Sequence, residues 1–177
     1  MTTWLTSDTH LGHRNIARYC GRPPDHEWRI VQGWQRALKP GDTLVHLGDF
    51  CFKSARPSAS WFAEIPRGVR TVLVEGNHDR RGKALGLGWG EVVSEGAQPH
   101  RLRCGGLTFA AQHRPPVDLP AWADAAVFGH VHERGTPVTW ERGILRACLC
   151  VELWDYSPVS LESLCRVYWS EMERRWG

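Results

Sequence analysis

Seven residues with side chains that bind metals follow short apolar stretches of this chain: Asp8, His10, Asp49, Asn77, His113, His130 and His132. Carboxylates, imidazoles and an amide oxygen suit hard or borderline divalent metals, of which Mn is our first choice and Fe, Zn and Ni are alternatives. Seven ligands are too many for one ion that keeps open positions, but they suit two ions that share a carboxylate. The residue types therefore indicate a centre for two divalent metal ions.

These residues occur in five short motifs: Asp8-Thr9-His10, Gly48-Asp49, Gly76-Asn77-His78-Asp79, Gln112-His113 and Gly129-His130-Val131-His132. Taken singly, most of them are ordinary turn chemistry, because Asn, Asp and Gly tolerate left-handed backbone. The paired histidines of the last motif are a stronger signal of a metal site. On an extended backbone, residues two positions apart face the same side, so each D-x-H or H-x-H pair would point to one site. The glycines at 48, 76 and 129 would let the chain turn sharply beside that site.

The elements that would hold these motifs alternate between strand and helix. The first half reads as strand, helix, strand, helix and strand, over residues 3–7, 27–38, 43–47, 58–65 and 70–74. This order predicts parallel strands with crossover helices, and the carboxyl ends of such strands meet at one edge. The second half reads as short strands and a closing amphipathic helix, over residues 101–104, 107–112, 125–128, 145–154 and 160–173. We therefore expect two packed sheets with helices outside them.

Length and composition are those of an ordinary folded protein. The 177 residues are about one domain's worth, so we expect a single domain over residues 1–177. The formal charge of +3 is a weak basic bias, which argues against nucleic acid as a partner. No apolar run approaches the about 20 residues of a membrane span, and Met1 leads into a strand without a signal-peptide pattern. We therefore expect a cytoplasmic protein that has no membrane partner.

The six cysteines form no C-x-x-C pair, which excludes a zinc-knuckle or thioredoxin motif. Cys148 and Cys150 would share one face of the strand 145–154 as small buried residues, and we expect all six thiols to be reduced. His46 falls inside a strand and is expected to be buried and hydrogen-bonded. The Gly-rich residues 82–90 read as either a lid or a plain loop. The ten tryptophans suit both core and subunit contacts, so the oligomeric state stays open.

As a set, the five motifs resemble the calcineurin-like metallophosphoesterase superfamily, whose pattern is D-x-H, G-D, G-N-H-[DE], a lone His and G-H-x-H. The resemblance implies an α/β fold, a four-layer α/β/β/α sandwich of two mixed β-sheets flanked by helices. It assigns Asp8, His10, Asp49 and His132 to one metal ion. It assigns Asp49, Asn77, His113 and His130 to the other, so that Asp49 bridges the two ions.

Within that superfamily, the chain is most similar to a group of small bacterial and phage phosphoesterases, through residues 8–16 and 151–161. It departs from that group at Cys150, where an Asn is typical, and after His113, where Arg114-Pro115 alters the usual block. Similarity to the protein Ser/Thr phosphatases is only partial. No Asp-Arg pair follows Gly48-Asp49, and the chain has no room for their longer recognition regions.

The mechanism that we expect is attack on phosphorus by a hydroxide that bridges the two metal ions. The metals would also neutralise the charge on the phosphoryl oxygens. His78, beside the ligand Asn77, would act as general acid and protonate the leaving oxygen. Asp79 would either orient His78 or simply form a turn. Substrate contacts are expected from four further residues, His13, Arg14, Asn15 and Arg114.

The leading hypothesis is therefore an enzyme that hydrolyses phosphodiesters, and phosphomonoesters as a further class, of small molecules such as nucleotides. One alternative is a nuclease acting on DNA or RNA, against which the small net charge argues. A second alternative is a metal-binding scaffold without catalytic activity. The presence of every ligand together with His78 argues against the scaffold.

Overall fold

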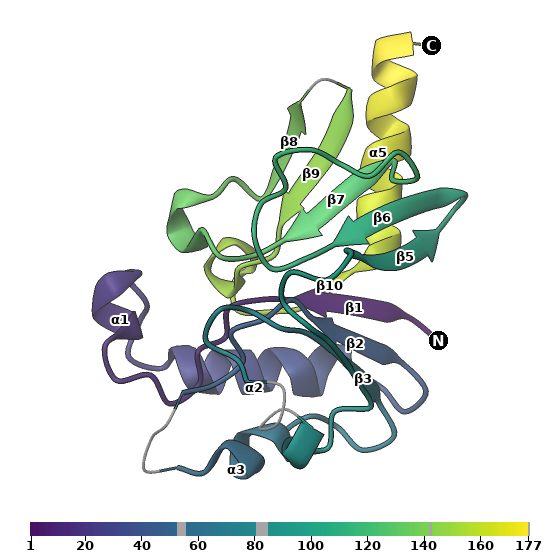
Figure 1. The fold of residues 1–177 in the computed structure, drawn as a ribbon. Coiled ribbons are helices and arrows are strands. Elements are labelled where there is room, and N and C mark those ends of the chain that lie inside the picture. The colour runs from purple at the N-terminus through teal and green to yellow at the C-terminus, as the bar shows by residue number, and fades with distance from the viewer. Residues whose placement is uncertain (53–55, 81–84, 142, 177) are drawn as a thin grey trace.

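Two mixed five-stranded sheets face each other in the computed structural model, which describes residues 1–52, 56–80, 85–141 and 143–176 (Figure 1). The first sheet has the strand order β10-β1-β2-β3-β4. Its strands are β1 (Thr3–Thr6), β2 (Thr43–His46), β3 (Arg70–Val74), β4 (Glu91–Val93) and β10 (Val159–Ser160). The first four run parallel, and β10 pairs antiparallel with β1.

The connections of the first sheet are the expected crossovers. Helices α1 (Ile16–Tyr19) and α2 (His26–Ala37) lie between β1 and β2, and α3 (Ser58–Phe62) lies between β2 and β3. Neighbouring residues of a strand face opposite sides of a sheet. Consecutive residues of β2 and of β3 are buried, so this sheet is covered on both faces. Leu44 and Leu73 pack with Trp34 of α2 on the helix side. Val45 belongs to the cluster on the other side, which faces the second sheet.

The second sheet has the strand order β5-β6-β7-β9-β8. Its strands are β5 (His100–Cys104), β6 (Leu107–Ala111), β7 (Ala125–Phe128), β8 (Val138–Glu141) and β9 (Ile144–Cys148). The three central strands are parallel, and the edge strands β5 and β8 are antiparallel to their neighbours. The carboxyl ends of β6 and β7 therefore lie at the same edge of this sheet.

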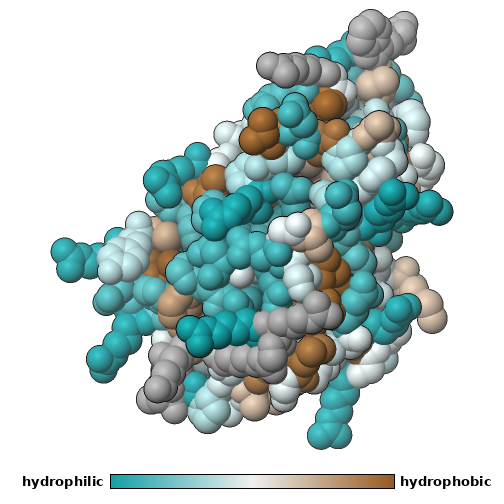
Figure 2. Space-filling model, viewed as in Figure 1, coloured by the Kyte–Doolittle hydropathy of each residue, from teal (hydrophilic) through white to brown (hydrophobic). Residues whose placement is uncertain are grey.

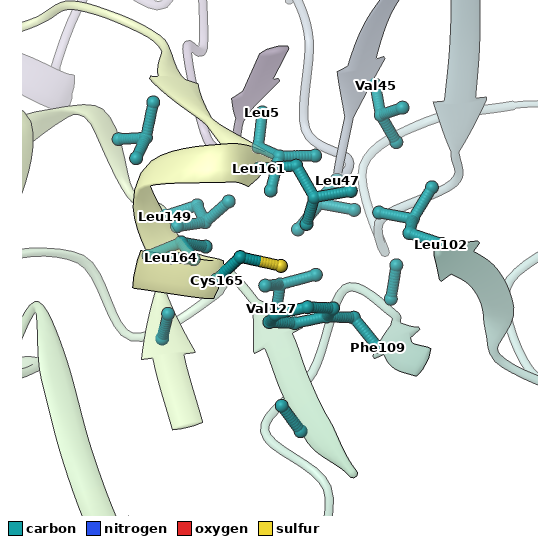
Figure 3. Packing of buried hydrophobic residues seen from close by; sticks show 14 of the residues in the cluster. Leu5, Val45, Leu47, Leu102, Phe109, Val127, Leu149, Leu161, Leu164 and Cys165 are labelled. Atoms are coloured by element: carbon teal, nitrogen blue, oxygen red, sulfur yellow. The ribbon is translucent and has the colours of Figure 1, made fainter. Parts of the chain in front are cut away.

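The main core fills the space between the sheets (Figure 3). Leu5 and Val45 of the first sheet point towards Phe109 and Val127 of the second. Helix α5 (Leu161–Trp176) contacts β1, β10 and β5, and its first turns add side chains to the same core. The expected arrangement, two mixed sheets flanked by helices, is thus confirmed. Among the described residues, no helix has the length and apolar character needed to cross a membrane.

One predicted strand is wrong. Residues 145–154 do not form a single strand, because β9 ends at Cys148 and Val151–Trp154 form a 3-10 helix, η2. Asp155 and Tyr156 then adopt left-handed backbone, which ends η2. Between the two elements, Cys150 forms an isolated parallel bridge with Ser7, so the chain crosses from the second sheet to the first at this point.

The Gly-rich segment 82–90 is described only in part, since residues 81–84 lie outside the described residues. In the described part, Trp89 is buried and its ring lies 5.3 Å from that of Phe50 and 5.2 Å from that of Phe62. This end of the segment is therefore anchored in the helix-side core.

Candidate active site

The loops that follow β1, β2, β3, β6 and β7 gather at one edge of the two sheets, towards the left of Figure 1. Backbone hydrogen bonds join them. The N–H of Asp8 donates to the carbonyl of Gly48 at 2.9 Å, and the N–H of Gly129 donates to that of His113 at 2.8 Å. Figure 2 shows hydrophilic side chains across this region.

Asp49 lies between two groups of candidate ligands. Its Oδ2 lies 3.5 Å from Nε2 of His10 and 3.5 Å from Nε2 of His113. On the His10 side, Oδ1 of Asp8 lies 3.7 Å from Nε2 of His10 and 3.5 Å from Nε2 of His132. One carboxylate oxygen is thus equidistant from imidazoles of both groups, which is the position that a bridging ligand needs.

The second group of candidate ligands has His113 at its centre. Nε2 of His113 lies 3.1 Å from Oδ1 of Asn77 and 3.2 Å from Nδ1 of His130. The Nδ1 atom of His113 lies 2.8 Å from the carbonyl of Leu47, which orients the ring. All seven residues that the sequence singled out are therefore brought together. Their division between two ions remains a prediction.

The contacts inside the cluster fit cations. Oδ1 of Asp8 and both ring nitrogens of His10 are buried without a hydrogen-bond partner among the described residues. Buried polar atoms left in this way are costly unless something binds them. Ligand atoms about 2.0–2.2 Å from a shared ion lie roughly 3–3.5 Å from each other. The separations of 3.1–3.7 Å in both groups agree with that spacing.

The backbone at the cluster is left-handed rather than extended. Five of the seven candidate ligands are non-glycine residues with positive φ: Asp8, His10, Asp49, His130 and His132. Such conformations are uncommon in L-residues, cost free energy and collect at functional sites. The expectation that the D-x-H and H-x-H pairs lie on extended backbone is therefore wrong, although the side chains of each pair do converge.

Two glycines serve close approach and not a turn. Only Gly48 of the three has positive φ, at +95°. A Cβ on Gly76 would overlap Oδ1 of Asp49, and one on Gly129 would overlap Oδ2 of Asp8 and the hydroxyl of Ser7. A side chain at either position would displace a candidate ligand.

Oδ2 of Asp8 is held by three neighbours. The hydroxyl of Ser7 lies at 2.5 Å, the N–H of His130 donates at 2.8 Å, and Sγ of Cys150 lies at 3.4 Å. Burial opposes ionisation of Asp8. The contacts with His10, the nearby imidazoles and Ser7 nevertheless lower the pKa of this carboxyl below its ordinary value. The carboxylate therefore presents Oδ1 to the imidazoles.

Cys150 now has a role, which the sequence alone did not supply. The N–H of His132 donates to its Sγ at 3.2 Å, so the thiol links Asp8 to His132. Burial raises the pKa of the Cys150 thiol, which keeps it protonated and able to donate to Asp8. Cys148 and Cys150 are both buried with their sulfurs 3.5 Å apart, and none of the six cysteines, all of them among the described residues, forms a disulfide.

Two charged residues that no motif marked support His132. Nδ1 of His132 lies 2.9 Å from Oε1 of Glu152, and Arg22 donates to the same oxygen through Nε and NH2 at 2.8 and 2.6 Å. Arg22 also donates to the carbonyl of Asp8 at 2.6 Å and is only 4% exposed. Burial lowers the pKa of His132, but its contacts with Cys20 and Glu152 raise the pKa to about 10. The available sequence signal for Glu152 was a single acidic residue in the otherwise apolar stretch 151–154.

Asp79 does not orient His78, which corrects one of the two roles considered for it. Its Oδ2 accepts the N–H of Asp49 at 2.6 Å and that of Gly76 at 3.0 Å, and its Oδ1 accepts the N–H of Phe50 at 3.2 Å. Both oxygens are therefore occupied by backbone donors. Asp79 ties the turn that carries Asp49 to the turn that carries His78, so it positions the site and is not a catalytic residue.

His78 is exposed beside the cluster. Its N–H donates to Oδ1 of Asp49 at 2.9 Å, and its ring lies 4.8 Å from that of Phe52 and 5.7 Å from that of His10. It lines a cleft of 560 Å³ together with Asp49, His10, His130 and His132. The side chain is thus placed to reach a group bound at the cluster.

The four residues expected to contact substrate lie in different places in the structure, and only one of them lines the cleft. His13 lines the cleft, but Arg14 and Asn15 are exposed and are not among the residues that line it. Arg114 lies on the other side, where its NH1 lies 2.9 Å from Nε2 of His130 and its Nε donates to Glu95 at 3.1 Å. The 3-10 helix His132–Arg134, η1, follows the last motif. The remainder of the cleft wall comes from residues that the sequence had not marked as site residues: Ile16 and Tyr19 of α1, Cys20 after it, and Glu133 and Arg134 of η1.

His46 has the expected buried position. It is fully buried, with Nε2 lying 3.0 Å from the hydroxyl of Thr9. Burial lowers the pKa of its imidazole to about 3. It therefore stays neutral behind the D-x-H loop and supports that loop through Thr9.

Comparison with known proteins finds relatives of this chain and of its fold. The chain is 24% identical to an uncharacterized protein of Methanocaldococcus jannaschii, covering 93% of this chain and 89% of that one. A crystal structure of a protein of unknown function from Aquifex aeolicus is 25% identical with a TM-score of 0.74, covering 94% and 98% of the two chains. A structure described as a novel archaeal phosphodiesterase shares the fold, with a TM-score of 0.53, 15% identity and coverage of 84% and 82%.

Residues 1–109 match the family described as calcineurin-like phosphoesterase, and they carry the first three of the five motifs together with strands β1 to β4 of the first sheet. This match extends over more than half of the 177 residues. Members of this family are metal-dependent phosphoesterases, which agrees with the two groups of His and Asp side chains found here. The chain belongs to the calcineurin-like phosphoesterase family.

Proposed function

We propose that this phosphoesterase hydrolyses phosphodiesters of small molecules, with nucleotides as the leading class, at a centre of two divalent metal ions, most suitably Mn²⁺. The observation that carries the proposal is Oδ2 of Asp49, placed 3.5 Å from one imidazole of each ligand group. Asp8, His10, Asp49 and His132 would hold one ion, and Asp49, Asn77, His113 and His130 the other. Together, two such ions supply activation of water and neutralisation of charge on the phosphoryl oxygens.

His78 is the residue that we assign to the leaving group. Its ring lies in the cleft and packs against Phe52, while its backbone N–H donates to Asp49. As the P–O bond to the leaving group breaks, His78 would give its ring proton to the departing oxygen. The alcohol then leaves neutral, which matters most when its own pKa is high.

Arg114 is the cation that we assign to the phosphoryl group. Its guanidinium lies 2.9 Å from Nε2 of His130, whose Nδ1 faces the cluster. When Nδ1 of His130 serves as a ligand, the ring proton is on Nε2, which then cannot accept from Arg114. The guanidinium is then available to bind a phosphoryl oxygen through charge-assisted hydrogen bonds.

The decisive experiment uses protein stripped of metal and assayed with and without added Mn²⁺. The substrates are bis-p-nitrophenyl phosphate, a diester, and p-nitrophenyl phosphate, a monoester. We expect metal-restored cleavage of the diester and weaker cleavage of the monoester. The same assay on the Asp49→Asn variant is the control for a contaminating phosphoesterase, because this variant should lose both metal binding and cleavage.

Cleavage that persists without metal, or that Asp49→Asn retains, would overturn the two-metal proposal. Absence of cleavage of either ester with two bound metal ions per chain would favour a scaffold. Mn-dependent cleavage of plasmid DNA or RNA at rates above those for the small esters would favour a nuclease.

A further inference from the structure

The cleft beside the metal ligands extends well beyond them. Six further residues complete the lining of its 560 Å³: His13, Ile16, Tyr19, Cys20, Glu133 and Arg134. They come from the loop after β1, from α1 and from η1, and Figure 1 shows α1 standing apart from α2 on this side. Clefts of about 300–1,000 Å³ accommodate small organic ligands. A phosphoryl group at the cluster would occupy only one end, so the α1–η1 end has room for an organic group attached to it.

Tyr19 gives that end its character. Its side chain is on a four-residue helix and is 64% exposed, although it lies on the wall of a cleft. Aromatic rings are costly to leave in water and are common where a ligand covers them. The ring of His13 lies between two other rings, 6.0 Å from that of Tyr19 and 4.2 Å from that of Phe52. Phe52 in turn contacts His78, so aromatic surface runs from the rim to the general acid.

The charges on this wall favour an uncharged group. Of the six lining residues, Glu133 and Arg134 carry opposite formal charges and both are exposed. They balance each other, so this end does not attract a second phosphate, which Glu133 would repel. A planar heterocycle fits better, because its face can stack on Tyr19 while its polar edge finds an acceptor in Glu133 and a donor in Arg134.

We propose that the cleft between α1 and η1 binds the base of a nucleoside phosphate ester, with Tyr19 as its stacking platform. The inference rests on the proposed function in one respect, since the phosphate of the same ligand lies at the metal centre. Tyr19 is thus a specificity-determining residue, and the favoured esters carry an uncharged planar group within one ribose of the reacting phosphorus.

Calorimetric titration of the Mn-loaded protein tests this proposal without depending on turnover. The probes are adenosine 5′-monophosphate and glycerol 1-phosphate, which share a phosphomonoester and differ in the base. We expect the adenosine ligand to bind at least tenfold more tightly. Tyr19→Ala should weaken its binding about tenfold, within the range for one stacked base, and leave glycerol phosphate unchanged. Tyr19→Phe, which keeps the ring, should stay within about twofold of the natural protein by the same argument.

A matched control is Trp28→Ala, because Trp28 is another exposed aromatic residue, 61% exposed, and is not among the residues that line the cleft. This variant should bind both probes as the natural protein does. Equal affinities for the two probes, undetectable binding of the adenosine ligand, or an equal loss for both in Tyr19→Ala would overturn the inference.

Cleavage rates of two cyclic diesters distinguish a failure of the base-binding subsite from a failure of the proposed hydrolysis. Adenosine 2′,3′-cyclic phosphate and glycerol 1,2-cyclic phosphate present the same five-membered cyclic diester with and without a base. A base preference in binding that Tyr19→Ala abolishes, with no diester cleaved, would support the subsite and sink the proposed hydrolysis. Cleavage of both cyclic esters at equal kcat/KM would support hydrolysis and sink the subsite.

Discussion

Sγ of Cys150 lies 3.4 Å from Oδ2 of Asp8, and both residues are fully buried. The same sulfur accepts the N–H of His132 at 3.2 Å. Cys150 therefore joins two candidate ligands of one ion that are 124 residues apart in the chain, Asp8 and His132. Hydrogen bonds of this kind fix the orientation of metal ligands, and their loss commonly weakens metal binding.

Cys150→Ala should weaken Mn²⁺ binding about 10–100-fold, because Asp8 loses a donor and the N–H of His132 loses its acceptor. Cys150→Ser keeps a small donor in the same place and should recover most of the affinity. Cys165→Ala is the matched control, since Cys165 is also buried but bonds to the carbonyl of Cys104, remote from the cluster. Metal titration of the three variants checks this. An affinity loss in Cys165→Ala as large as in Cys150→Ala would mean that general destabilisation, and not the link to Asp8, is responsible.

Glu152→Gln should weaken binding at the ion held by His132 by about 10–100-fold. The carboxylate accepts from Nδ1 of His132 and balances the buried charge of Arg22, and a neutral amide does both less well. Metal content per chain after dialysis, with the Kd of each ion, measures the effect. Glu141→Gln removes an acid from an ion pair with Arg146 on the second sheet and should leave both affinities unchanged. Loss of the two ions to the same extent would contradict a specific action through His132.

His78→Ala should retain both metal ions and lose rate, by about 10²–10⁴-fold for esters with poor leaving groups. A p-nitrophenolate leaves readily without a proton, so bis-p-nitrophenyl phosphate should be much less affected than an alkyl diester. The measurement is kcat for a series of diesters graded by the pKa of the leaving alcohol, plotted for both proteins. Equal losses along the series would show that His78 does not act as the general acid.

The motif residues were predictable because each ligand follows a strand that is itself easy to recognise. Val72 and Val74 alternate with Leu73 of the helix-side core along β3, for example, and the strand ends two residues before Gly76. The strands β10 and β4, of two and three residues, were missed because so few positions show no alternation. The four-residue strand β8 was missed as well, although β1 of the same length was predicted. The extension of β9 to Trp154 failed because Cys150-Val151 is apolar like a strand, whereas the backbone there turns to join Ser7.

The residues that support the ligands were not predictable from spacing. Arg22 and Glu152 are 130 positions apart and meet only because the loop after β1 and the segment after β9 reach the same edge. Asp79 illustrates the converse case, since its place beside His78 suggested a catalytic contact. Its side chain instead turns back to the N–H groups of Asp49 and Phe50. Sequence neighbours in a tight turn need not point the same way, so adjacency carried little information about this pair.

His46 makes the stability of the metal-free protein fall as the pH falls. Burial lowers the pKa of its imidazole to about 3, whereas an unfolded histidine titrates near about 6.5. Between these two values the unfolded chain binds the proton and the folded chain does not, so unfolding is favoured increasingly from pH about 6.5 down to about 3. The contribution of His46 should therefore be fully present at pH 7.5 and reduced by about 2 kcal/mol at pH 5.

Urea unfolding in the presence of a chelator, at pH 7.5 and pH 5, measures this contribution. His46→Gln removes the titrating group and retains an amide near the hydroxyl of Thr9, so its packing defect should be the same at both pH values. We expect the natural protein to lose about 2 kcal/mol more than the variant over this interval, because the other titrating groups are common to both. Parallel losses in the two proteins would mean that His46 takes up its proton in the folded state too, which would contradict its burial as a neutral ring behind the D-x-H loop.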